Sequence, residues 1–400
     1  MRDIDLNIKT DYRHTAAACY IGYITQAIVN NFAPLLFVTF HREYNISLDK
    51  IGLLVTLNFG TQLLVDLVSA AIADRVGYRR LVVAAHAFAA AGLVGLGVLP
   101  GLFGSAYAGI AAAVVIYAIG GGLTEVVISP IIEACPFDKK SSAMSLLHSF
   151  YCWGSVLVVL VSTAVFSAFG VSCWRAAACL WAVIPFLNMF YFTRVPIGEL
   201  VEGGRGMSIK ELVTARVFWL LALLMVCAGA SELAMSQWAS AFAESGLSVS
   251  KTVGDLAGPC FFAVLMGLSR VLHAKIGEGV ELTKYLGICA VVCAASYLLA
   301  SLSPLPVLSL LGCGICGFSV GAMWPGTFSL ASRECPRGGT AMFALLALAG
   351  DCGCGGGPTA VGFVSAALGD DLKKGLLSAI AFPLLMLAVL MIMRKTMKEK

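Results

Sequence analysis

Charge is scarce in this sequence. Asp, Glu, Lys and Arg together make up 12% of the 400 residues, whereas hydrophobic residues make up 59%. A typical soluble domain has about 25% charged residues, so this composition excludes a soluble globular protein. Lipid must be the main solvent of the chain, and apolar runs of about 18 residues or more are expected to cross the bilayer as helices.

Long polar segments are also lacking. The longest stretch between apolar runs is the charged, glycine-containing segment 195–215, which is too short for the output domain that a membrane sensor needs. No cluster of His, Asp and Glu has metal-site spacing and no serine nucleophile motif occurs, so we expect neither an enzyme nor a bound metal or cofactor. The first apolar run is too long for the core of a cleavable signal.

What the sequence does contain is a series of twelve apolar runs. We therefore predict an all-α membrane protein with twelve transmembrane helices. The 14 cysteines mostly lie singly within these runs, where a Cys side chain behaves as a small hydrophobic group. The predicted spans are 14–40, 51–73, 81–101, 106–132, 142–169, 174–194, 216–241, 254–274, 282–302, 305–332, 340–369 and 372–393.

The positive residues of the loops predict the orientation. With the N-terminus placed inside, 21 of the 27 Lys and Arg residues fall on the inner side. The positive-inside rule then predicts a multi-pass protein of the cell membrane with both termini in the cytoplasm, and a bacterial inner membrane is the expected location. The net charge of +4 is a consequence of this topology and does not indicate nucleic-acid binding.

A weak internal repeat relates the two halves of the chain. Residues 73–77 correspond to 273–277 at an offset of 200, and Gly121, Ser129, Cys135 and Pro136 match Gly321, Ser329, Cys335 and Pro336 at the same offset. An even number of spans in each repeat makes the repeats parallel. We predict a six-helix bundle over 1–194, a cytoplasmic linker over 195–215 and a second six-helix bundle over 216–400.

Polar side chains within the spans mark the expected substrate site. Every third span is almost free of them, so the remaining spans are expected to enclose a wet interior, because polar groups in hydrocarbon are costly. Amides both donate and accept hydrogen bonds, which suits hydroxyl groups, and tryptophans could stack on a sugar ring. Ordinary packing is the alternative for each. The candidates are Gln26, Asn30, Asn31, Asn58, Gln62, His148, Tyr151, Trp153, Gln237, Trp238 and Trp324.

The loop after the second span carries a recognisable motif. Ala70-x-x-x-Asp74-Arg75-Val76-Gly77-Tyr78-Arg79-Arg80 resembles the loop signature of the major facilitator superfamily, with Ala70 in place of the usual glycine. The resemblance implies two six-helix halves around a cavity that opens alternately to each side. It also implies a gating role for Asp74, Arg75 and Arg79, to which we add Asp66; an ordinary salt bridge in a positive loop is the alternative.

Within that superfamily the chain is most similar to the fucose/hexose:proton symporter branch. The similarity rests on Leu146-Leu147-His148-Ser149-Phe150-Tyr151-Cys152-Trp153-Gly154, on Met323-Trp324-Pro325-Gly326 and on Gly350-Asp351. In that branch an acidic residue of span 1 and a glutamate of span 4 are implicated in sugar binding and proton coupling. Glu125 matches the glutamate, but the first span of this chain contains no carboxylate.

Proton coupling is expected from carboxylates inside the spans. Ionised carboxylates at the bilayer centre cost at least about 2.5 kcal/mol, and desolvation favours the neutral form of such a group. We rank Glu125 first, Asp351 second and Glu232 third as coupling residues; a permanent hydrogen bond to another helix is the alternative. A proton gradient is the expected energy source.

The absence of Lys and Arg from the middle of the spans narrows the substrate. Sugar phosphates and carboxylates are usually held by cationic clamps, so a neutral sugar or polyol is expected. The protein is expected to act as a monomer and to import its solute, since span 5, unlike that of drug/proton antiporters, contains no proline. Export of cationic or amphipathic compounds is the alternative. The glycine-rich stretch 350–358 is expected to be a hinge or a tight helix crossing.

Overall fold

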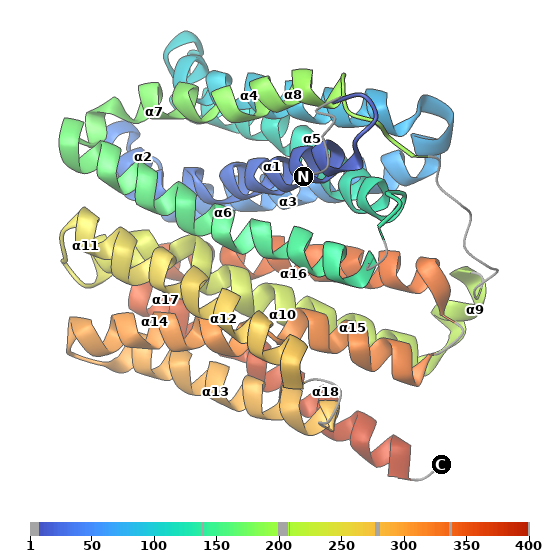
Figure 1. Cartoon of the computed structure of the whole chain (residues 1–400). Coiled ribbons are helices and arrows are strands. Elements are labelled where there is room, and N and C mark those ends of the chain that lie inside the picture. The colour runs from blue at the N-terminus through green and yellow to red at the C-terminus, as the bar shows by residue number, and fades with distance from the viewer. Residues whose placement is uncertain are drawn as a thin grey trace, which may run out of the picture. The chain divides into compact units, whose positions relative to one another are not determined.

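The chain folds into two compact helical units. The computed structural model describes residues 8–137, 140–198, 207, 209–276, 281–335 and 338–398. Unit 1 comprises Met1–Ala33 with Thr61–Glu202, and unit 2 comprises Pro34–Gly60 with Gly203–Lys400. Figure 1 shows the helices of each unit running roughly side by side as a bundle. Of the linker predicted over 195–215, residues 199–206 and 208 lie outside the described residues, and its last part contains the short helix α9, Ile209–Thr214.

Unit 1 contains α1, the second part of α3, and the helices α4 to α8. Each begins near the residue at which its apolar run begins. The bounds are α1 Tyr12–Asn31, α3 Leu48–Val76, α4 Tyr78–Leu102, α5 Ala106–Glu133, α6 Lys140–Phe169, the short 3-10 turn η2 Val171–Cys173, α7 Trp174–Trp181 and α8 Val183–Phe192.

Unit 2 contains α2, the first part of α3 and the helices from α9 onward. The bounds are η1 Ala33–Leu36, α2 Phe37–Tyr44, α9 Ile209–Thr214, α10 Arg216–Ala241, the π-helical η3 Phe242–Gly246, α11 Lys251–Asp255, the π-helical η4 Leu256–Cys260, α12 Phe261–Ile276, α13 Leu282–Leu302, α14 Pro306–Val320, α15 Met323–Glu334, α16 Gly339–Ala367, α17 Leu372–Ser378 and α18 Ala381–Lys398.

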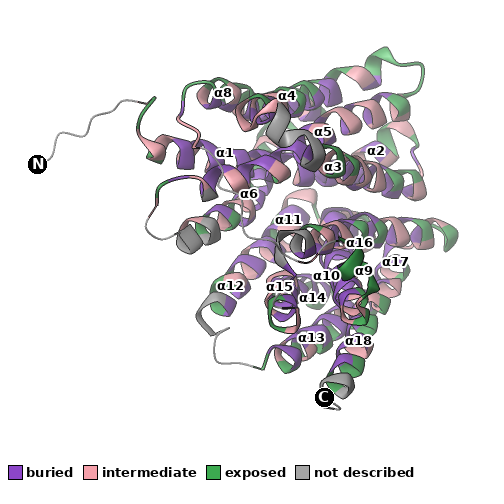
Figure 2. Ribbon diagram, turned by 90° about the vertical axis from the view of Figure 1, so that its right-hand side faces the viewer, coloured by how far each residue is buried: buried purple, intermediate pink, exposed green. Residues whose placement is uncertain are grey.

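The predicted all-α membrane fold is confirmed. Among the described residues, eleven helical segments are long and apolar enough to cross a membrane. The remaining predicted span, 340–369, corresponds to the 29-residue helix α16, Gly339–Ala367. Large apolar side chains such as Leu102, Val307 and Phe169 are exposed, which is the expected state of groups that contact lipid. Figure 2 shows buried and exposed faces alternating around the helices.

The two halves of the sequence pack their helices in the same pattern. In the first half α1 packs on α6, and α4 packs on α5 and α8. In the second half the equivalent spans pack in the same way, α10 on α16, and α13 on α14 and α18. The offset of 200 residues found in the sequence therefore corresponds to a repeated structural unit.

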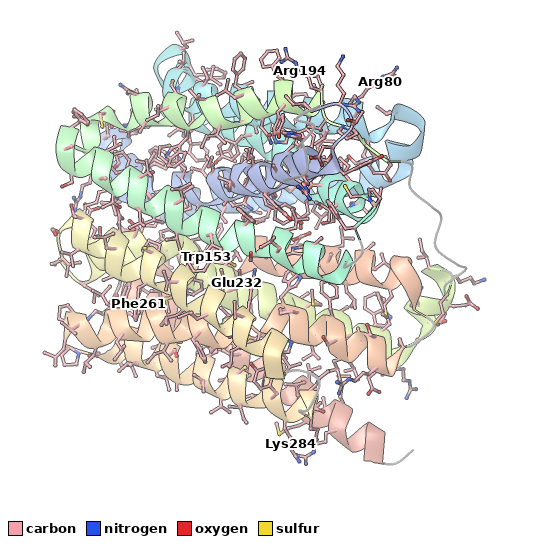
Figure 3. The ribbon with its side chains drawn as sticks, in the orientation of Figure 1. Arg80, Trp153, Arg194, Glu232, Phe261 and Lys284 are labelled. Atoms are coloured by element: carbon pink, nitrogen blue, oxygen red, sulfur yellow. The ribbon has the colours of Figure 1, made fainter. Side chains whose placement is uncertain are left out.

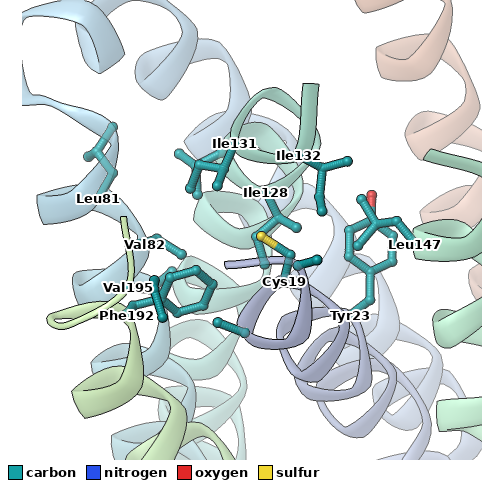
Figure 4. Packing of buried hydrophobic residues seen from close by; sticks show 14 of the residues in the cluster. Cys19, Tyr23, Leu81, Val82, Ile128, Ile131, Ile132, Leu147, Phe192 and Val195 are labelled. Carbon is teal, nitrogen blue, oxygen red and sulfur yellow. The ribbon is translucent and has the colours of Figure 1, made fainter. Parts of the chain in front are cut away.

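Small residues allow the closest of these contacts. A Cβ at Gly92 of α4 would overlap Tyr117 of α5, and one at Gly312 of α14 would lie 2.7 Å from the backbone nitrogen of Ala300 on α13. Dispersion and close packing drive helix association in lipid, so such residues stabilise the bundle. The buried apolar side chains of α1, α4 and α5 form a continuous cluster that includes Cys19, Val82 and Ile128 (Figure 4).

The segment 34–60 packs within unit 2, although it belongs to the first two spans. The Phe37 ring lies 5.2 Å from the Trp238 ring, and the Thr56 and Thr359 hydroxyls are hydrogen-bonded. A Cβ at Gly52 would already be in contact with Gly362 of α16. We refer to residues 34–60 as the crossover segment.

Two ion pairs hold the end of the crossover segment. Arg42 Nη1 lies 2.8 Å from Glu244 Oε1, with the Arg42 side chain 63% exposed. Lys251 Nζ donates to the Leu35 carbonyl oxygen at 2.5 Å and pairs with Asp255 Oδ2 at 3.1 Å. Asp255 is fully buried and also accepts from the Ser240 hydroxyl. The buried pair is the stronger determinant, because exposed ion pairs contribute about 0–1 kcal/mol.

Replacing Lys251 with methionine is expected to destabilise unit 2 by about 3–5 kcal/mol, because it leaves the Asp255 carboxylate buried without its charge partner. The double variant Lys251→Met/Asp255→Leu removes both charges and is expected to recover most of the loss. Denaturant unfolding of the detergent-solubilised protein measures both. Equal destabilisation by the single and double variants would contradict the assignment.

Candidate functional site

Three amide side chains form a hydrogen-bonded chain inside unit 1. Gln26 Nε2 donates to Gln62 Oε1, and Gln62 Nε2 donates to Asn30 Oδ1, each at 2.9 Å. Gln26 and Asn30 are one turn apart on α1, so both side chains face Gln62 of α3. All three are buried, and Gln26 Oε1 has no hydrogen-bond partner among the described residues. The site therefore retains an unused acceptor.

A glycine of α5 makes room for this amide chain. A Cβ at Gly121 would lie 3.0 Å from Gln62 Cδ and 3.2 Å from Gln26 Oε1. Gly321, its counterpart in the second half, is equally close to α12, since a Cβ there would lie 2.7 Å from the Met266 carbonyl oxygen. The close approach of these spans is thus a property of the repeat, whereas the amide chain has no counterpart at the matching positions of the second half, where Phe262 stands in place of Gln62.

Two carboxylates lie on the same side of α5. A Cβ at Gly122 would be 3.1 Å from Asp66 Oδ1, and Glu125 follows one turn later on α5. The two acids are close enough to interact electrostatically. Asp66 Oδ1 is buried and has no hydrogen-bond partner among the described residues, while the Glu125 side chain is exposed.

The same face of α5 continues toward α1 and α6. Tyr23 of α1 hydrogen-bonds Ser129 of α5 through their hydroxyls at 3.0 Å. The His148 ring of α6 lies edge-on to the Tyr23 ring, with centroids 5.2 Å apart. Tyr23 is buried, His148 is exposed, and the Tyr23 hydroxyl interacts electrostatically with Glu125. Polar groups from four spans, α1, α3, α5 and α6, therefore lie near the face of α5 that bears Glu125.

The other candidates of unit 1 lie around this group. Asn31 Nδ2 donates to the Ala27 carbonyl at 2.9 Å and to Ser155 Oγ at 3.1 Å. Tyr151 is half-buried and packs against the apolar cluster. Trp153 is 47% exposed on α6 (Figure 3). That exposure leaves its indole ring free to meet lipid or solute.

Unit 2 contains a second charged pair, formed by Glu232 and Arg270. Glu232 of α10 is buried, and its Oε2 lies 3.5 Å from Arg270 Nη2; Figure 3 labels Glu232 within this unit. Arg270 lies near the end of the predicted span 254–274 and was not singled out as a candidate from the sequence. The helix α12 continues to Ile276, so the guanidinium falls within the membrane-spanning segment Lys251–His273.

The remaining candidates of unit 2 are mostly enclosed. Asn58, Gln237 and Asp351 are buried. Trp238 is fully buried, and its Nε1 donates to the Pro358 carbonyl at 2.9 Å, so it serves the packing of α10 on α16. Trp324 is half-buried, and only a glycine at position 350 leaves space for its indole ring.

The candidates for gating are only partly described. The side chains of Asp74 and Arg75 lie outside the described residues. Arg79 Nη1 donates to the Phe192 carbonyl at 2.7 Å, at the end of α8, where a cation also stabilises the helix dipole. Figure 3 shows Arg80 and Arg194 at this same end of unit 1. Asp66 lies earlier on α3 than Asp74, near Glu125 of α5.

Two charged groups were missed by the sequence interpretation. Neither Lys251 nor Asp255 was singled out from the sequence, yet they form the buried pair that holds the crossover segment. Their spacing of four residues, which brings side chains together on a helix, is the signal that could have identified the pair. No comparable signal linked Arg270 to Glu232, which is 38 residues away in the sequence.

The fold and these intramembrane polar groups define a membrane transporter. The family model of the Major Facilitator Superfamily matches residues 19–358. The chain therefore belongs to the Major Facilitator Superfamily, as its loop motif predicted.

Solved structures of transporters share this fold. A bacterial homologue of the human lysosomal transporter Spinster, in an inward-facing and occupied conformation, is 15% identical with a TM-score of 0.77, over 96% of this chain and 97% of that chain. A D-xylose–proton symporter is 14% identical with a TM-score of 0.73, over 95% of each chain. The E. coli fucose:proton symporter is 14% identical with a TM-score of 0.64, over 94% and 98%. No curated protein sequence matches the chain.

Proposed function

We propose that this protein imports a neutral, hydroxyl-rich solute, such as a sugar or polyol, together with protons. The observation that carries the proposal is the amide chain Gln26–Gln62–Asn30 beside the carboxylates of Asp66 and Glu125. Amides offer donors and acceptors in fixed positions, and a hydroxyl group needs both. The carboxylates supply groups that can bind and release protons.

The charge balance of the spans supports a neutral solute. The side chains that surround the amide chain in unit 1 are amides, acids, a tyrosine and glycines. In unit 2 the positive charge of Arg270 is balanced by Glu232. An anionic solute would have to displace Glu232 from Arg270 and leave a carboxylate unpaired, which is costly in a low dielectric.

Transport by alternating access requires one end of the protein to close. With both termini in the cytoplasm, the ion pairs Arg42–Glu244 and Lys251–Asp255 lie on the extracellular side. We infer that these pairs, with the packing of the crossover segment on α10, α11 and α16, hold the outer part of unit 2 together. The segment also buries Phe37 against Trp238, so the two ion pairs stabilise a contact that is largely apolar.

The solute class is tested by a thermal-shift screen of the purified protein. We expect neutral hexoses, pentoses or polyols to raise the unfolding temperature and cationic amphipathic compounds to leave it unchanged. Sugar phosphates serve as the matched anionic controls and are expected to have no effect. Stabilisation by cationic compounds alone would overturn the proposal in favour of a drug exporter.

Replacing Gln62 with leucine is expected to weaken solute binding by roughly tenfold, because it removes a donor and an acceptor offered to the solute, each hydrogen bond being worth about 0.5–1.5 kcal/mol. Calorimetric titration with the best solute of the screen measures the change. Phe262→Leu, at the matching position of the other half, is the control and should leave the affinity unchanged. Unaltered binding to Gln62→Leu would place the solute elsewhere.

A further inference from the structure

Asp66 occupies a position that the sequence did not predict. The family resemblance places the partner of the span-4 glutamate on span 1, but span 1 here carries Gln26, Asn30 and Asn31 and no acid. The structure instead brings a carboxylate of α3 to the face of α5 that bears Glu125. We propose that Asp66 and Glu125 form one proton-binding site, in which the two carboxyl groups share their protons.

The geometry of α5 supports this pairing. Gly121 faces Gln62 and Gln26, and Gly122 faces Gln62, Val65 and Asp66. Glu125 lies three residues after Gly122 and four after Gly121, so its side chain points between these two directions, toward α3 and α1. Because Gly122 has no side chain, the α3 backbone approaches α5 closely enough for Asp66 to reach the same space.

The internal repeat shows that packing does not require these acids. At the offset of 200, Asp66 corresponds to Met266 and Glu125 to Pro325. The second half brings the equivalent spans equally close, at Gly321, without a carboxylate. An acid pair confined to one of two structurally equivalent places is therefore a specific addition. Placing like charges side by side is unfavourable, and a shared proton removes the repulsion.

The groups around Asp66 and Glu125 are consistent with a proton bound between the two carboxyl groups. The Asp66 Oδ1 atom is buried without a hydrogen-bond partner among the described residues, as expected for an oxygen that awaits a carboxylic proton from its neighbour. The other titratable side chains on this face include Tyr23 from α1 and, beyond it, His148 from α6. The exposure of Glu125 and His148 gives the site a route to water.

The pair is tested by titrating the carboxylic acid band of the purified protein in infrared difference spectra. This inference rests on the proposed proton coupling but is measured without any solute, so its failure is separate from failure of the sugar assignment. Two interacting acids titrate in two macroscopic steps that belong to the pair. After subtraction of the signal of the double variant, which retains the remaining acids, we expect two steps in the wild type, one in Asp66→Asn and one in Glu125→Gln.

The decisive comparison is the Glu125 step with and without Asp66. A changed midpoint in Asp66→Asn supports the pair. An unchanged midpoint, or variant spectra that simply add up to the wild-type spectrum, overturns it. Asp49→Asn, at the start of the same helix α3, is the control and should leave both steps in place. Thermal unfolding of each variant confirms that the titrated protein is folded.

Discussion

Glu125→Gln is expected to abolish the accumulation of solute driven by an inward proton gradient. The glutamine keeps the shape and the hydrogen-bonding capacity of the side chain but cannot bind or release a proton. The variant should therefore still exchange solute across the membrane, since the amide chain Gln26–Gln62–Asn30 is intact. Uptake and counterflow in proteoliposomes measure the two activities separately.

The control for this prediction is Glu281→Gln. Glu281 precedes α13 and forms an exposed ion pair with Lys284, so its loss should change neither activity. If Glu125→Gln accumulated solute as well as the wild type, proton coupling through α5 would be refuted. If it lost counterflow as well, Glu125 would be needed for solute binding and not for coupling alone.

Gly353→Ala and Gly357→Ala are each expected to destabilise the protein by about 1–3 kcal/mol, the cost of overpacking a close contact. A Cβ at Gly353 would lie 2.9 Å from the Ala230 nitrogen, and one at Gly357 would lie 2.6 Å from the Ala230 carbonyl oxygen. Both glycines thus face the backbone of α10. Thermal or denaturant unfolding measures the loss.

Gly356 offers a matched control within the same helix. It is exposed, and a Cβ there meets nothing within 4 Å. Alanine favours an α-helix over glycine by about 1 kcal/mol, so Gly356→Ala should be neutral or stabilising. Equal destabilisation by all three variants would show that α16 acts as a flexible hinge, in which every glycine is needed, and not as a tight crossing with α10.

The fold of this protein could be predicted because it is determined by the length and spacing of the apolar runs in the sequence. Runs of apolar residues long enough to cross a bilayer must form helices, since backbone groups in lipid have no other partners. The matched glycines Gly121 and Gly321 then revealed the repeat. The motif at Asp74-Arg75-Val76-Gly77 indicated the superfamily, which the family model confirms over residues 19–358.

The site could be predicted only as a set of residue types. The side chains of Gln26, Asn30 and Gln62 were all candidates, but hydropathy cannot show that Gln62 hydrogen-bonds both of the others. Asp66 was assigned to gating because it is two turns from Asp74, whereas its position is determined by the close approach that Gly122 permits. The roles of these residues stay predictions.

The charged groups near the ends of the spans were the most difficult to place. A loop charge and a helix-end charge look alike in sequence, because a helix continues past the apolar run wherever its polar residues reach water or a partner. Arg270 illustrates this: its partner Glu232 lies on another helix. The same holds for Lys251, which contacts the Leu35 carbonyl of the crossover segment.

The central claim is that solute and protons cross the membrane together. Its most direct test uses sealed proteoliposomes, with the solute identified by the thermal-shift screen and a pH-sensitive dye inside. Adding solute outside, at equal pH on both sides, should acidify the interior, and an imposed inward proton gradient should drive accumulation that a protonophore abolishes. Accumulation without any proton movement, unaffected by the protonophore, would contradict the account.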